Sequence, residues 1–113
     1  MNVVVSRSGA ALTGAADLTS FDVRVDGADE DAFTAVLQRE RVGTFVPGPA
    51  FPGGHVHVRV EWLRAAAGAH DLPADWAESF AGMLAYAERK GWTSPDGATV
   101  RGHVVTGAGT GER

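Results

Sequence analysis

The chain has 113 residues, enough for one domain that folds around its own core without disulfides or a structural metal. It contains no cysteine, so disulfides, thiolate metal sites and cysteine nucleophiles are excluded. Fourteen acidic residues against ten basic ones give a net charge of −4, which argues against nucleic acid or an anionic membrane surface as partner. We therefore expect a small-molecule ligand.

The composition also bears on origin and location. Isoleucine is absent, and lysine and asparagine occur once each, a bias typical of a GC-rich bacterial genome. The first residues have neither a basic leader nor a long apolar run, so we expect no signal peptide and no membrane span. These features predict a cytoplasmic bacterial protein.

The first half of the chain predicts three strands and a helix. Phe21, Val23 and Val25 alternate with charged residues, as in a strand with one buried face. The expected elements are a strand at Val3–Val5, a loop through Gly14, a strand at Phe21–Val25, a helix capped by Asp29 and running to Arg39, and a strand at Val42–Val46.

The second half predicts two strands around a longer helix. Trp76, Phe80, Met83, Leu84 and Ala87 form an apolar helical stripe. The segment from Leu63 to His70 fits either a helical turn or a connection. The expected elements are a loop at Pro47–Gly54, a strand at Gly54–Trp62, a helix from about Asp71 that ends before Gly91, a turn at Ser94–Gly97, a strand at Val100–Val105 and a disordered tail over 106–113.

This order indicates an α+β fold, with residues 1–105 as a single domain. After the first strand, the elements follow the β-α-β-β-α-β order of a ferredoxin-like sandwich. In that fold the strands that begin at Phe21 and Val56 are adjacent and parallel, and the last strand flanks the first of them. One core is expected to contain Val23, Val25, Val58, Val60, Phe33, Leu37, Phe80 and Leu84.

The strand from Gly54 to Trp62 also predicts a candidate site. Because side chains in a strand have period two, its valines face one side while His55, His57, Arg59 and Glu61 face the other. Neighbouring strands add further charged residues to that polar face: Asp22, Arg24, Asp26, Arg101 and His103. A solvated sheet face is the alternative interpretation, but three histidines and three arginines are an uncommon way to make one.

We assign roles within this cluster as follows. A histidine carries a proton and an arginine holds developing negative charge in our first hypothesis, a cofactor-free isomerase, cyclase, lyase or monooxygenase. The catalytic candidates are His57, Arg59 and His103; the ligand-binding candidates are Arg24, His55, Glu61, Arg101 and, as a cap from the preceding loop, Phe51. The second hypothesis is a non-catalytic interaction or ligand-binding module.

A divalent metal held by His55, His57 and Glu61 is a further alternative. Their spacing, followed by Gly68, resembles the first metal motif of cupins, but the glycine before it, the second motif and the jelly-roll strands are missing. We therefore predict no metal and no other cofactor. An uncovered sheet face and an isolated apolar first strand also predict a homodimer.

Overall fold

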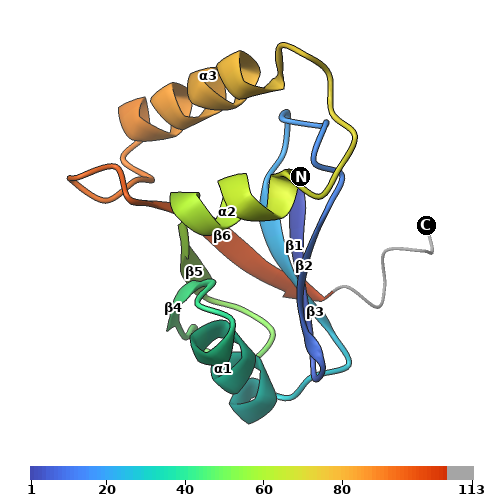
Figure 1. Cartoon of the computed structure of the whole chain (residues 1–113). Coiled ribbons are helices and arrows are strands. Elements are labelled where there is room, and N and C mark those ends of the chain that lie inside the picture. Colours follow the sequence, from blue (N-terminus) through green and yellow to red (C-terminus); the bar gives the residue numbers. More distant parts are fainter. Residues whose placement is uncertain (107–113) are drawn as a thin grey trace.

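One mixed, curled sheet of six strands organises residues 1–106, the part of the chain that the computed structural model describes (Figure 1). The helices of these residues are α1 (Glu30–Arg39), α2 (Val60–Ala67) and α3 (Trp76–Arg89). The strands are β1 (Asn2–Ser6), β2 (Gly9–Thr13), β3 (Asp22–Asp26), β4 (Gly43–Val46), β5 (His55–Arg59) and β6 (Thr99–Thr106). The α+β class is confirmed. The tail was expected to begin at Thr106, but this residue ends β6; the rest of the expected tail, 107–113, lies outside the described residues.

The strand order is β2-β1-β3-β6-β5-β4. β3 runs parallel to both β1 and β6, whereas β5 runs antiparallel to both β6 and β4. The predicted adjacency of the Phe21 and Val56 strands is therefore wrong, because β6 lies between β3 and β5. The period of a strand decides which side chains face the core but leaves open which strand pairs with which.

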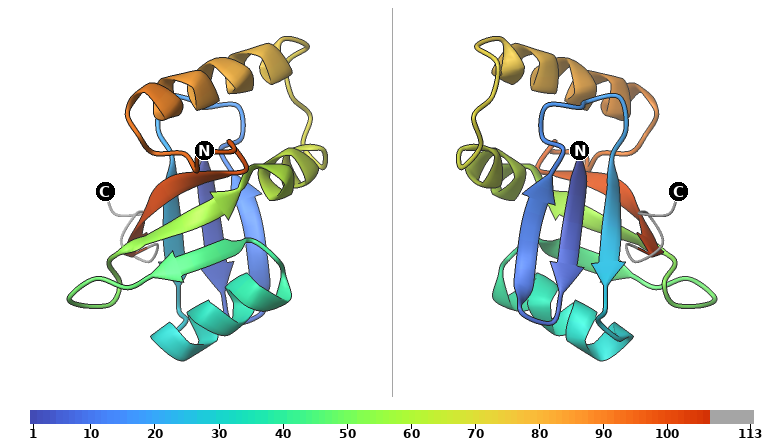
Figure 2. Two further views of the ribbon diagram at one scale, coloured as in Figure 1. Left: turned by 90° about the vertical axis from the view of Figure 1, so that its left-hand side faces the viewer. Right: turned by 90° about the vertical axis from the view of Figure 1, so that its right-hand side faces the viewer.

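The sheet curls so that its valines line an interior that α1 and α2 fill. α1 contacts β1, β2 and β4, and α2 contacts β2 and β5, so each of these helices touches both halves of the sheet. In the two views of Figure 2 the strands face the viewer, and none of the helices within residues 1–106 covers their outer surface. The sheet thus has an inner face packed on the core and a bare outer face.

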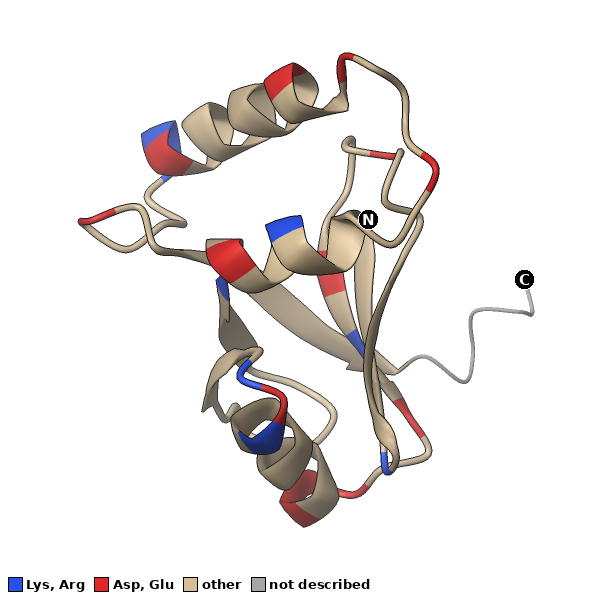
Figure 3. Ribbon diagram, viewed as in Figure 1, with Lys and Arg blue, Asp and Glu red and all other residues tan. Residues whose placement is uncertain are grey.

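The core matches the expected one closely. Val23, Val25, Val58, Val60, Phe33, Leu37 and Phe80 are buried, and Leu84 is partly buried against them. The Asp29 side chain caps α1 by accepting a hydrogen bond from the backbone N–H of Ala32 at 2.8 Å. Acidic residues begin α1 and a basic residue ends it, as the helix dipole favours (Figure 3).

Three local predictions need correction. The segment expected to be a loop before Gly14 contains β2, which pairs with β1 as a hairpin. The strand expected to reach Trp62 ends at Arg59, and α2 begins at Val60, which resolves the ambiguous segment as helix. α3 begins at Trp76 rather than near Asp71. In the second case Val60 suits both a strand face and a helix face, so its apolar character does not decide between the two.

α3 lies across one end of the sheet (Figure 1). Trp76 fixes its start, because its indole N–H donates a hydrogen bond of 2.7 Å to the carbonyl of Ala15 and its ring stacks on Phe80. Gly91 follows its end with a φ of 77°, as predicted for a residue after a helix. Within residues 1–106, no helix combines the length and apolar character needed to cross a membrane.

Candidate functional site

The outer face of β5 carries the predicted histidines. Val56 and Val58 are fully buried on the inner face, whereas His55 and His57 alternate with them and are partly exposed. The prediction of which face each side chain occupies is thus confirmed for this strand. Arg59 has the same parity and is also partly exposed.

The register of the sheet brings most of the predicted polar residues together. His103 on β6 lies directly between Asp22 on β3 and His55 on β5. One step along β5, His57 lies beside Arg101 on one side and Thr44 on the other. Because β6 occupies the middle of this cluster, its two polar residues lie at the centre rather than at the flank that a ferredoxin-like order predicts.

His55 has an environment that disfavours its charged form. Its ring lies 4.9 Å from that of His57 between centroids, with the ring planes at 88°. Partial burial lowers the pKa of His55 below 6.5, and the positive charges of His57, Arg101 and His103 lower it further. This region of the outer face therefore places the Arg101 guanidinium among three histidines.

Arg24 lies at the edge of this region rather than at its centre. Its cross-strand neighbours are Val4 and Val105, and its guanidinium Nε is paired with the Asp22 carboxylate at 3.1 Å. Asp22 and Arg24 largely neutralise each other. This leaves Arg101 as the fixed positive charge beside the histidines.

Arg59 and Glu61 form an ion pair of 2.7 Å. Arg59 also donates a hydrogen bond of 3.0 Å to the backbone carbonyl of Arg41, which holds its guanidinium in place. Glu61 does not join the polar row, because it belongs to α2 and its side chain is 82% exposed. Its predicted place on the same strand face is wrong, and its observed contact is the ion pair with Arg59.

A groove of about 310 Å³ lies where the end of α1 meets β4, β5 and β6. His57 and Arg59, two of the predicted catalytic residues, line it together with residues that sequence reasoning missed: Gln38, Arg41, Gly43, Thr44 and Thr99, with the main chain near Leu37. Hydrogen-bond donors and cations thus dominate its polar lining. We therefore take this groove as the candidate binding site on the outer face.

The backbone conformation of Arg41 is a feature of the site that the sequence does not reveal. It has a φ of 56°, in the left-handed region where glycine usually stands after a helix. A larger residue at this position costs backbone energy of about 1 kcal/mol. Backbone strain of this kind is concentrated at functional sites, so the conformation marks Arg41 as a candidate functional residue.

Phe51 is not a cap over this site. Its ring lies 5.4 Å from that of Phe33 and 6.1 Å from that of Phe45, between centroids. Phe45 pairs with Val56, so this aromatic cluster lies on the inner face, away from the histidines. The predicted role of Phe51 in contacting a ligand there is contradicted by its position; the loop instead contributes to the core.

The described residues, 1–106, offer no group of three or more histidine, cysteine, aspartate or glutamate side chains that could hold a metal ion. His55, His57 and Glu61 do not form such a group, because Glu61 lies on α2 and not on the outer face of β5 with the two histidines. No family model, curated protein or solved structure matches the chain. The function must therefore be argued from the geometry of the site.

Proposed function

We propose that the groove beside His57 binds a small organic anion. The observation that carries this proposal is that His57 shares its groove with two arginines and has a third as its partner on the neighbouring strand. Arg41 and Arg59 line the same groove as His57, and Arg101 is its cross-strand neighbour. Guanidinium groups match carboxylate oxygens in charge and geometry. An anion at this point would offset the charges of Arg41 and Arg101 and would add a second partner to Arg59, which Glu61 already pairs.

The strained backbone of Arg41 supports the same proposal. Glycine would satisfy the left-handed turn at lower cost, so the turn does not explain the arginine. A side chain that contacts a bound anion would. Thr44 and Thr99 add hydroxyl groups able to donate hydrogen bonds to the same ligand.

As the reaction class we propose proton transfer without a cofactor, of the isomerase, cyclase, lyase or monooxygenase type. His57 would remove a proton from a carbon next to a carbonyl or carboxylate, and the C–H electron pair would become an enolate. The guanidinium groups of Arg59 and Arg101 would stabilise the enolate oxygen until the proton returns. Histidine suits this role because its ordinary pKa lies near neutral pH.

A non-catalytic ligand-binding module is the second candidate. The open shape of the outer face favours it, because no helix of residues 1–106 shields that face from water. In either case we propose a homodimer in which two outer faces enclose the site, as in α+β barrels of ferredoxin-like domains. This part of the proposal rests on analogy of element order, since β6 separates the strands that are adjacent in those domains.

Binding is tested with malonate, using malonamide as an uncharged molecule of similar shape. NMR of the histidine ring protons follows all four histidines, and His70, which is exposed beyond the end of α2, serves as the internal control. At constant ionic strength, malonate should shift the His57 signal in a saturable way and leave His70 unchanged. Equal shifts at all four histidines, or an equal response to malonamide, would overturn the proposal.

Turnover is tested separately, with pyruvate in D₂O. Enolisation replaces its methyl protons with deuterons, and NMR records the loss of the methyl signal. The catalytic hypothesis predicts faster exchange with the protein than with buffer, and loss of that acceleration in His57→Gln. Saturable malonate binding without accelerated exchange would favour the binding module.

A further inference from the structure

We infer that a second site, between α3 and the end of the sheet, binds a small aromatic molecule. A cavity of about 330 Å³ lies there, at the lower end of the volumes found for small-molecule sites. Six of its lining residues are apolar or aromatic: Phe21, Met83, Tyr86, Ala87, Trp92 and Val100. Its chemistry differs from that of the groove beside His57, and its occupation does not depend on that site.

The cavity arises from how α3 is attached. At its start, the indole N–H of Trp76 donates a hydrogen bond of 2.7 Å to the carbonyl of Ala15. At its end, the backbone N–H of Arg101 donates a hydrogen bond of 2.7 Å to the carbonyl of Trp92. Between these two attachments, Met83, Tyr86 and Ala87 follow helical spacing and face the space over the end of the sheet. The helix is thus tied down at both ends and leaves room in the middle.

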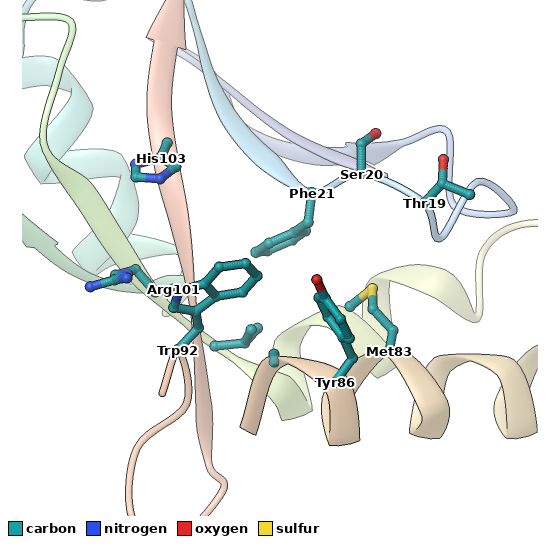
Figure 4. Close-up of a pocket in the computed structure, with 10 residues that line it drawn as sticks. Thr19, Ser20, Phe21, Met83, Tyr86, Trp92, Arg101 and His103 are labelled. Carbon is teal, nitrogen blue, oxygen red and sulfur yellow. The ribbon is translucent and has the colours of Figure 1, made fainter. Parts of the chain in front are cut away.

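The floor of the cavity depends on Gly102. Phe21 lies against this glycine so closely that an added Cβ would come within 2.9 Å of the Phe21 ring. In Figure 4 the Phe21 ring lies between β6 and Tyr86, while the Arg101 side chain extends to the other side of β6. The guanidinium therefore lies on the outer face. Thr19, Ser20, Arg101 and His103 border the cavity, and the rest of its lining is apolar or aromatic.

Three observations identify the class of ligand. Tyr86 and Trp92 are 48% and 38% exposed, although each has a large apolar surface that folding has not covered. Their rings are 6.0 Å apart between centroids in an edge-to-face arrangement, so together they form an aromatic wall against which a further ring can pack. The Tyr86 hydroxyl points toward the cavity in Figure 4. A one- or two-ring molecule with a single hydroxyl or carbonyl group fits these features.

The test uses p-cresol as the probe and methionine methyl NMR as the readout. The chain has two methionines: Met83 lines the cavity, whereas Met1 is buried in the core and serves as the internal control. We expect p-cresol to shift the Met83 methyl signal in a saturable way while the Met1 signal stays in place. Equal movement of both signals, or no movement up to the solubility limit, would overturn the inference.

Two variants sharpen the test. Ala87→Leu fills the cavity from α3 and should abolish the Met83 shift, whereas Ala85→Leu, on the exposed side of the same helix, should leave it unchanged. Tyr86→Phe removes only the hydroxyl and should weaken p-cresol binding about threefold to tenfold, the value of one hydrogen bond, but should not weaken toluene binding. Unaltered p-cresol binding in both Ala87→Leu and Tyr86→Phe would place the probe elsewhere.

Discussion

His55 and His103 are direct partners across β5 and β6, on a sheet face that no helix of residues 1–106 covers. The pKa of His55 lies below 6.5, first because of partial burial and then because of the neighbouring positive charges. We expect Arg101→Gln to raise the pKa of His55, since it removes one of those charges. Titration of the His55 ring protons by NMR measures this, with Arg64→Gln on α2 as the control; an unchanged pKa in Arg101→Gln would contradict the electrostatic account.

The same pKa predicts how stability depends on pH. A histidine whose pKa is lower in the folded protein binds fewer protons there than in the unfolded chain, between the folded pKa and 6.5. The free energy of unfolding should therefore decrease as the pH falls from 6.5 through this interval. Urea unfolding between pH 5 and 8 tests this, and His55→Gln should flatten the curve whereas His70→Gln should not.

Gly43 is expected to be essential for the pairing of β4 with β5. A Cβ at this position would overlap the backbone carbonyl oxygen of His57, which cannot move without breaking the ladder. Gly43→Ala should lower the free energy of unfolding by about 2–4 kcal/mol. The matched control is Gly82→Ala on the exposed side of α3, where a methyl group meets nothing and should stabilise the helix by up to about 1 kcal/mol. Equal effects in the two variants would refute the close approach.

Replacing Arg41 should change stability and ligand binding in opposite directions. Arg41→Gly should raise the free energy of unfolding by up to about 1 kcal/mol, because glycine adopts the left-handed conformation without strain. The same change removes a guanidinium from the groove and should weaken malonate binding. Thermal unfolding and a binding titration on one sample measure both effects; a variant that is less stable and binds normally would show that the arginine serves the turn alone.

Phe51 is expected to matter for stability and not for the groove. Its ring contacts Phe33 and Phe45 in the inner aromatic cluster, so Phe51→Ala should cost roughly 1–3 kcal/mol of stability. Phe51→Leu keeps most of the apolar surface and should cost less. Neither should change malonate affinity while the protein is folded, which distinguishes this position from the cap that its sequence context suggested.

Self-association remains a prediction of the bare outer face. Val46 and Val105 are exposed there, and Val4 is partly exposed beside Arg24. If two outer faces meet, Val105→Asp should convert a dimer to a monomer without loss of the fold. Light scattering over a range of concentrations measures the mass; a monomer at every concentration in the unmodified protein would exclude the dimer.

The sequence predicted what periodicity and capping determine. Asp29, Phe33 and the valines of β3 and β5 have the local contexts that specify a capped helix and half-buried strands, and the structure confirms them. Strand order was not predictable, since β6 could pair beside β3 alone or between β3 and β5 without altering any alternation. The inner residues of β6 suit its central position, because Gly102 leaves room for the Phe21 ring. This fit can be recognised only once β3 is known to be the neighbouring strand.

The candidate site was predictable in part for the same reason. The shared face of His55, His57 and His103 follows directly from the period of two. Arg41 reaches the site through a turn conformation and Thr44 through the pairing register of β4 with β5, and no local sequence pattern predicts either feature. Glu61 and Phe51 were misplaced because each lies next to a change in structure: the start of α2 in one case and a loop that folds back on the core in the other.

The dissociation constant of malonate in His57→Ala tests the central claim most directly. Removing one partner of a charged hydrogen bond should weaken binding about tenfold to a hundredfold. The thermal midpoint should stay nearly unchanged, because His57 faces away from the valine core. His70→Ala should bind as the unmodified protein does. If His57→Ala binds malonate normally, or unfolds, then the outer face near His57 is not an anion site.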